Sequence, residues 1–162
     1  HRVPCCGFLF REKLSLPHIK REMIDFYKIP HYAINSIKQG ADWTTLEGDI
    51  IPNNRLVFAG DAPRSYAYCS DTAYYPSLCE PLKGVNLLYH EATFAEDMAE
   101  RARLVGHSTA RQAAQIARAA EVGKLLLGHF SARYEDETVL LQEAQEVFPN
   151  AILAHEGLCI SL

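Results

Sequence analysis

Residues of the kind that bind metal ions follow several apolar stretches of this sequence. Asp71 follows SYAYCS, His90 and Glu91 follow VNLLY, His107 stands in GHST, and His129 follows KLLLG. Zinc, manganese and iron take imidazole nitrogens and carboxylate oxygens as ligands, and one carboxylate can bridge two ions. Taken singly, each histidine is more often a hydrogen-bonded structural residue, and Asp71 could equally cap a turn. Together they form a suitable ligand set for such ions, but by residue type and spacing alone the signal is weak.

The elements that must position these residues alternate between strands and helices, which predicts the α/β class. Strands are expected at 3–10, 48–52, 55–59, 65–70, 85–89, 124–127, 151–154 and 158–162, and helices at 19–27, 32–38, 77–83, 96–104, 108–120 and 136–148. The carboxyl ends of such strands converge on one site. Asn53 and Asn54 predict a tight turn that pairs 48–52 with 55–59, Ser108 predicts a helix cap, and Gly128 is expected to let the backbone turn.

Composition bounds the class of protein. The 162 residues are 48% apolar and 22% charged, which is typical of one globular domain. A net charge of −4 leaves no overall basic field for nucleic acid, so a local cluster of Arg and Lys would have to hold any polyanion. The five cysteines form no Cys-x-x-Cys pair, which favours a reducing, cytoplasmic location. We expect no membrane association, because no apolar run approaches the roughly 20 residues of a span.

A series of motifs resembles ribonuclease Z, the tRNA 3′-processing endonuclease family of the metallo-β-lactamase superfamily. HRVPCCGFLFRE, SDT, LLYHEATF, GHSTARQAA and LLLGHFSARY occur in the family's order and span nearly the whole chain. The resemblance implies a metallo-β-lactamase-like layered αββα sandwich, of which these residues form only the carboxyl-terminal half. It also implies a zinc-dependent endoribonuclease that removes 3′ trailers from precursor tRNA and leaves a 3′ hydroxyl on the tRNA.

The resemblance assigns three metal ligands, His1, Asp71 and His129. It implies two Zn²⁺ per full-length subunit, with Mn²⁺ or Mg²⁺ as alternatives. The superfamily signature His-x-His-x-Asp-His, which carries most ligands of the first metal, is not among these residues. We therefore interpret the chain as part of a longer enzyme with an incomplete site, and we expect it alone to bind metal poorly and to lack nuclease activity.

The resemblance also assigns the remaining site residues. His107 matches the histidine that protonates the leaving oxygen, and Glu91 is expected to orient it. Ser131 and Arg133 fall where the family contacts substrate phosphates, which a hydroxyl and a guanidinium fork suit.

The expected partners are precursor tRNA and a second copy of the protein in a homodimer. Residues 1–162 form one domain part with a helical excursion at about 14–40, which matches the family's tRNA-binding arm. The sequence at 29–33 lacks the glycine of the Gly-Pro turn found in such arms, and the basic residues of the excursion could equally form a solvated helix face. Two other functions stay open, namely a phosphodiesterase or arylsulfatase-like hydrolase of small substrates, and a non-catalytic interaction module.

Overall fold

The computed structural model describes residues 4–162, and the chain divides into two compact units. One unit comprises the residues up to Arg11 together with Arg64–Leu162, and the other comprises Glu12–Pro63. Among the described residues, no helix is long and apolar enough to cross a membrane.

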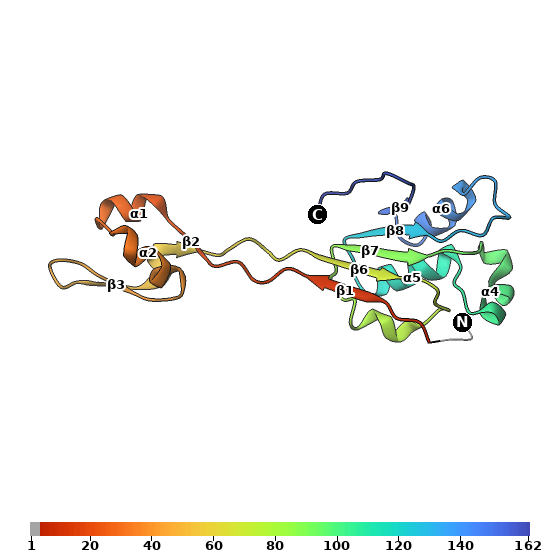
Figure 1. Cartoon of the computed structure of the whole chain (residues 1–162), viewed down its shortest axis with the longest axis horizontal. Coiled ribbons are helices and arrows are strands. Elements are labelled where there is room, and N and C mark those ends of the chain that lie inside the picture. The colour runs from red at the N-terminus through yellow and green to blue at the C-terminus, as the bar shows by residue number, and fades with distance from the viewer. Residues whose placement is uncertain (1–3) are drawn as a thin grey trace. The chain divides into compact units, whose positions relative to one another are not determined.

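A five-stranded sheet forms the frame of the first unit (Figure 1). Its order is β1 (Phe8–Arg11), β6 (Ser65–Cys69), β7 (Leu87–Glu91), β8 (Lys124–Gly128) and β9 (Ala151–Leu153). The strands β6 to β9 run parallel, and β1 pairs antiparallel with β6. Cys69 is aligned with His90, and His90 with Leu127, so the carboxyl ends of three neighbouring strands reach the same edge. This register brings the polar residues that follow β6, β7 and β8 to the same edge of the sheet.

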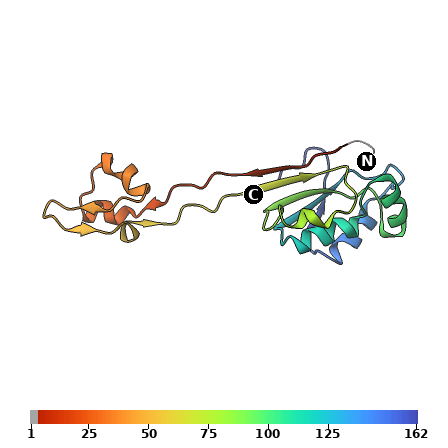
Figure 2. The same cartoon turned by 90° about the horizontal axis from the view of Figure 1, so that it is seen from below.

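Helices cover one face of this sheet. They are α5 (Ala110–Ala119) and α6 (Thr138–Gln145), whereas α4 (Ala99–Val105) lies beyond the carboxyl ends of the strands (Figure 1), and short 3-10 helices occur at Pro76–Cys79 and Glu96–Met98. Figure 2 shows α5 and α6 together on one side of the strands. Four alanines of α5 are fully buried and let it lie close on Leu88, Leu125 and Leu127, which are themselves fully buried; they are Ala110, Ala113, Ala114 and Ala117. Each of these leucines contributes about 1.5–3 kcal/mol by leaving water.

The opposite face of the sheet carries aromatic side chains. Tyr68 and Tyr89 stack with ring centroids 4.6 Å apart, and Phe10 and Tyr66 with centroids 6.0 Å apart. Phe10 is 58% exposed. Within residues 4–162, this unit therefore consists of one sheet layer and one helix layer.

The start of α5 corrects the expected cap. Thr109, not Ser108, is the N-cap residue: its hydroxyl accepts from the Gln112 N–H, and the Gln112 side chain accepts from the Thr109 N–H. Ser108 Oγ instead donates to the Thr72 carbonyl at 2.7 Å. Ser108 therefore connects the start of α5 to the segment that follows β6.

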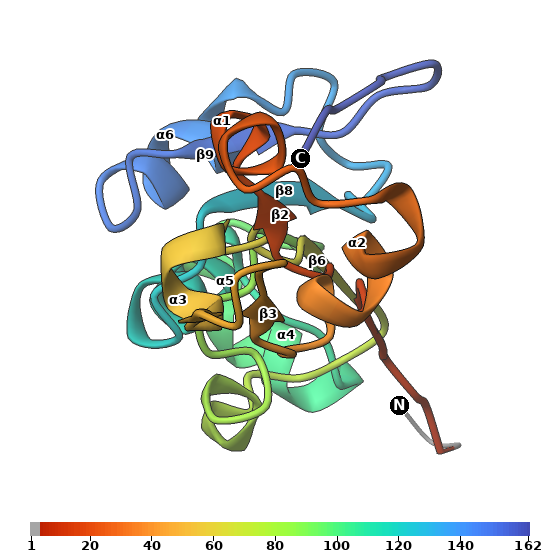
Figure 3. The same ribbon diagram turned by 90° about the vertical axis from the view of Figure 1, so that its left-hand side faces the viewer.

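The second unit is small and has its own core (Figure 3). Its elements are β2 (His18–Ile19), α1 (Arg21–Phe26), α2 (His31–Lys38), β3 (Trp43–Thr44), β4 (Ile50–Ile51), α3 (Asn53–Leu56) and β5 (Val57–Phe58). The buried core residues are Ile29, Ala33, Ile37, Ile51 and Leu56. The strands pair as β2 with β5 and β3 with β4.

The expected hairpin across Asn53 and Asn54 is wrong. These residues begin α3, because Asn53 Nδ2 donates to the carbonyls of Ile37 at 2.6 Å and Ala41 at 2.8 Å. Those contacts come from a segment far away in the sequence, so the local turn preference loses to tertiary contacts. The strand expected at 158–162 is also wrong, since these residues have no regular structure.

Candidate metal and proton-transfer site

Asp71 and His129 follow the carboxyl ends of β6 and β8, and both have a left-handed backbone. Their φ angles are 51° and 58°. Residues other than glycine adopt this conformation at a cost of roughly 1–2 kcal/mol. The turn after β8 was expected at Gly128, but the positive φ belongs to His129. Gly128 instead leaves room for the Tyr89 ring, which a Cβ at that position would overlap.

Asp71, His107 and His129 form a cluster, called here the metal group, whose possible ligand atoms all lie within 4.8 Å of one another. Asp71 Oδ1 and His129 Nε2 are 3.3 Å apart. Two tetrahedral ligands at about 2.1 Å from a zinc ion would stand roughly 3.4 Å apart. The donor set and this separation therefore fit an ion of the zinc class. His1, the third expected ligand, lies outside the described residues.

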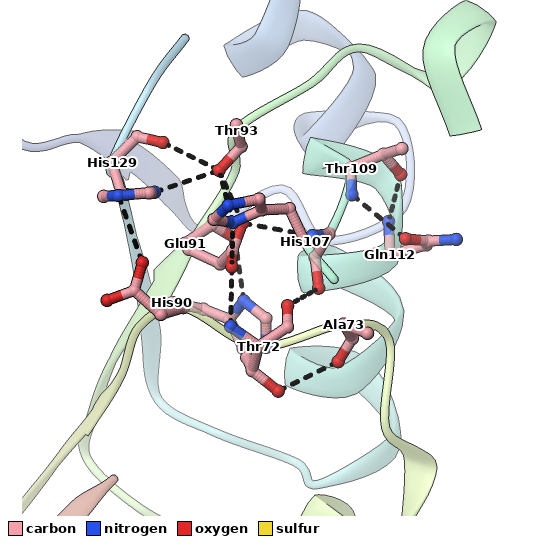
Figure 4. A network of polar contacts seen from close by, with 11 residues as sticks. Thr72, Ala73, His90, Glu91, Thr93, His107, Thr109, Gln112 and His129 are labelled. Atoms are coloured by element: carbon pink, nitrogen blue, oxygen red, sulfur yellow. Dashed lines mark hydrogen bonds and ion pairs between the residues drawn. The ribbon is translucent and has the colours of Figure 1, made fainter. Parts of the chain in front are cut away.

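Behind the metal group lies Glu91, whose side chain is completely buried (Figure 4). Its Oε1 accepts from the Thr72 N–H at 2.6 Å and contacts His107 Nδ1 at 2.8 Å. Its Oε2 accepts from the Thr93 hydroxyl at 2.6 Å and the Ser108 N–H at 3.0 Å. A buried carboxylate is costly unless such donors replace water, and here both oxygens are satisfied.

The contact with Glu91 determines how His107 faces the site. With Nδ1 donating to the carboxylate, Nε2 is the ring nitrogen that can meet a ligand, and it can donate a proton only from the doubly protonated ring. The His107 and His129 rings stack with centroids 5.2 Å apart. The expected contact between Glu91 and His107 is thus present, while the role of His107 as proton donor stays a prediction.

Thr93 is a site residue that the sequence reasoning missed. Its hydroxyl lies 2.6 Å from Glu91 Oε2 and 3.0 Å from His129 Nδ1 (Figure 4). If its one proton goes to Glu91, the hydroxyl oxygen accepts from His129 Nδ1–H. His129 Nε2 is then unprotonated and directed at Asp71, as a metal ligand must be. The available signal was the spacing, since Thr93 lies two residues after Glu91, on the same side of an extended segment.

Ser131 and Arg133 lie beside this network. Arg133 Nε donates to Ser131 Oγ at 3.2 Å, and the guanidinium lies 5.2 Å from the centroid of the Phe94 ring. The Ser131 N–H donates to the Thr93 carbonyl at 3.1 Å. Their contact with substrate phosphate stays a prediction.

His90, the other polar residue at this strand end, faces the core. It is fully buried, its Nδ1 lies 2.8 Å from the Glu91 carbonyl, and burial lowers the pKa of its imidazole. It is not part of the metal group.

Comparisons with known proteins find ribonuclease Z proteins among the relatives of this chain. A ribonuclease Z from Bacteroides fragilis (strain YCH46) is 60% identical over all 162 residues, and one from Porphyromonas gingivalis (strain W83) is 49% identical over the same residues. The resemblance to ribonuclease Z is confirmed. The chain spans about half the length of these relatives, 53% of each. No protein-family model matches the chain.

Solved structures confirm the expected fold class. The metallo-β-lactamase fold protein YhfI from Bacillus subtilis is 28% identical with a TM-score of 0.55, over 59% of this chain and 39% of that protein. The short form of human tRNase Z is 26% identical with a TM-score of 0.50, over 65% of this chain and 36% of that protein. The chain therefore has part of a metallo-β-lactamase fold.

Proposed function

We propose that this chain is the carboxyl-terminal part of a metal-dependent endoribonuclease that removes 3′ trailers from precursor tRNA. The observation that carries the proposal is the metal group at the strand ends, backed by the buried Glu91, in a chain 60% identical to a protein named ribonuclease Z. Two candidate ligands, Asp71 and His129, have a left-handed backbone, and strain of this kind clusters at active sites. It therefore favours an enzyme over a non-catalytic binding module.

The side chains divide the work of hydrolysis. Asp71 and His129 would hold zinc, which when bound polarises the phosphate and activates the attacking water. Ser131 and Arg133 would orient the phosphate oxygens through a hydroxyl and a guanidinium. His107, fixed by Glu91 at 2.8 Å, would donate its Nε2 proton to the departing 3′ oxygen.

We extend the proposal to the unit Glu12–Pro63, which contains the helical excursion and would act as an arm that contacts tRNA. Between positions 12 and 63 there are seven Asp and Glu residues against six Lys and Arg, so general basicity would not drive this contact. The unit instead has a cavity of about 460 Å³ whose lining includes Tyr27, Tyr32 and Trp43. Aromatic stacking on unpaired bases is the contact that such residues favour. A cytoplasmic homodimer of the full-length protein completes the proposal.

Zinc content and cleavage by the full-length protein test the roles. We expect Asp71→Ala and His129→Ala to lose zinc, and His107→Ala to keep zinc while cleaving precursor tRNA at least 100-fold more slowly, since acid catalysis contributes roughly 10²–10⁴-fold. His155→Ala, at an exposed histidine, is the control. Loss of zinc from His107→Ala would make His107 a ligand and overturn the assigned roles.

Substrate choice is tested with the same protein. Turnover of a chromogenic phosphodiester without cleavage of precursor tRNA would refute the proposed substrate. The purified 162-residue chain should hold fewer than two zinc ions and show no nuclease activity, because we expect further ligands from residues outside it.

A further inference from the structure

Two cavities border the metal group, each through one of its residues. The first, of about 200 Å³, has Asp71 and Tyr75 in its lining. The second, of about 280 Å³, has His107 and Tyr74 in its lining and is called here the Tyr74 cavity. Its size is near the lower end for small-molecule sites, which run from about 300 to 1,000 Å³, and it suits a single nucleoside.

The position of His107 indicates which part of a substrate the Tyr74 cavity would take. If His107 protonates the departing 3′ oxygen, the ribose that carries this oxygen must lie within hydrogen-bond reach of the imidazole. The nucleoside before the cleaved bond then lies on the His107 side of the reacting phosphate. The cavity on that side is the one lined by Tyr74.

The charge in the Tyr74 cavity favours a neutral ligand group. Arg103 and Glu100, both in its lining, form a two-point ion pair with Nε–Oε2 at 3.1 Å and Nη2–Oε1 at 2.6 Å. The Arg103 guanidinium lowers the pKa of Glu100, which stays ionised. A phosphate would meet the Glu100 carboxylate as well as the guanidinium, so the pair offers it little net attraction. The carboxylate can instead accept from ribose hydroxyls.

The other lining groups suit a nucleobase. Tyr74 is 41% exposed and lines the cavity, where its ring can stack with a base. Gln112 Oε1 accepts from the Thr109 N–H at 3.0 Å, which orients the side-chain amide. Its Nε2 has no hydrogen bond within residues 4–162 and can donate to a base carbonyl or ring nitrogen.

We propose that the Tyr74 cavity binds the nucleoside whose 3′ oxygen departs, with its base stacked on Tyr74 and its ribose hydroxyls near Glu100. This assignment rests on the proposed function. Under this assignment, Tyr74 is a positioning residue that places the leaving oxygen at His107. The Tyr74 cavity would then hold the last nucleoside of the tRNA, and the trailer would lie on the other side of the cleaved bond.

A double-perturbation experiment with the full-length protein tests this assignment. Precursor tRNA is prepared intact, with an abasic nucleotide just before the cleaved bond, or with an abasic nucleotide just after it. For the unmodified protein, removing the base before the bond should lower kcat/KM by roughly 5- to 150-fold, the range of one stacked base. Tyr74→Ala should lower kcat/KM for the intact substrate by a similar factor, and the two changes together should do no more than either alone.

Matched variants keep the result specific. Tyr74→Phe should retain stacking and cleave normally, and Leu104→Ala, at a residue of α4 that is 66% exposed, should behave like the unmodified protein. Removing the base after the bond should have the same effect in Tyr74→Ala as in the unmodified protein. Circular dichroism and zinc content confirm that Tyr74→Ala is folded and loaded.

Two results would overturn the assignment in different ways. If the Tyr74→Ala and abasic effects multiply, the base before the bond does not stack on Tyr74, although the protein still processes tRNA. If the unmodified protein fails to cleave precursor tRNA at all, the proposed function fails first and the nucleoside site fails with it.

Discussion

Replacing Glu91 by glutamine exchanges one oxygen of a buried carboxylate for an amide nitrogen. The carboxylate is held by the Thr72 and Ser108 N–H groups, the Thr93 hydroxyl and His107 Nδ1. One oxygen faces Thr72 and His107, and the other faces Ser108 and Thr93. In either orientation, the NH2 group of the new amide faces a backbone N–H, that of Thr72 or that of Ser108, and this buried donor then has no acceptor.

The expected loss of stability follows from those four contacts. One buried backbone donor loses its acceptor, which costs about 1–3 kcal/mol, and the remaining bonds lose their charged partner. The neutral side chain offsets part of this loss, because it no longer has to be buried as an ion. We expect Glu91→Gln to lower the free energy of unfolding by about 2–4 kcal/mol.

Urea unfolding of the 162-residue chain measures this loss, with hydrogen exchange of the backbone amides of β7 and β8 as the probe. Trp43, the only tryptophan, lies in the other unit and would report on the wrong transition. Glu146→Gln is the control, because Glu146 is exposed and pairs with Arg111 at the surface, where an ion pair contributes less than about 1 kcal/mol. Equal losses in the two variants, within about 0.5 kcal/mol, would refute the reasoning from buried hydrogen bonds.

Three further predictions follow from the backbone and the core. Arg11 and Ser65 are paired across β1 and β6, so replacing residues 12–64 by Asn-Gly should join these two strands as a hairpin. In the full-length protein, this deletion should raise KM for precursor tRNA at least 10-fold and leave hydrolysis of a small chromogenic phosphodiester unchanged. An equal loss on both substrates would show that the deletion damages the site itself. Asp71→Gly should have a free energy of unfolding about 1 kcal/mol higher than Asp71→Ala in urea titrations, because only glycine adopts the left-handed φ of 51° without strain. The reverse order would refute strain at this position. Burial lowers the pKa of His90, so below about pH 6.5 the unfolded chain binds a proton that the folded chain does not. As the pH decreases below that value, the free energy of unfolding should therefore decrease by up to about 1.4 kcal/mol per pH unit from this residue. His90→Leu should flatten this dependence in urea titrations at pH 7 and pH 5, and an unchanged slope would contradict it.

The sequence alone predicted the buried strands and the main helices of the first unit and the residue types of its site, although not the cap of α5 or the irregular end at 158–162. Apolar runs such as Leu125–Leu127 and the small-residue face of α5 specify buried strands and a close-packed helix, because burial depends on side chains that a local pattern displays. Asp71 and His129 could be chosen because they follow such strands and stand in motifs that resemble ribonuclease Z. The pairing of Glu91 with His107 could be expected for the same reason.

Only the tertiary structure decided the features that depend on contacts between distant segments. Asn53 begins a helix because carbonyls from another segment meet its amide, and Thr93 joins Glu91 to His129 because parallel strands align their ends. The left-handed φ of His129 occurs where the Thr93 hydroxyl contacts both its ring and its carbonyl. The Tyr74 cavity likewise combines residues from three separate stretches. Such contacts are set by the register of the sheet and the docking of α4 and α5, which no local pattern of residues encodes.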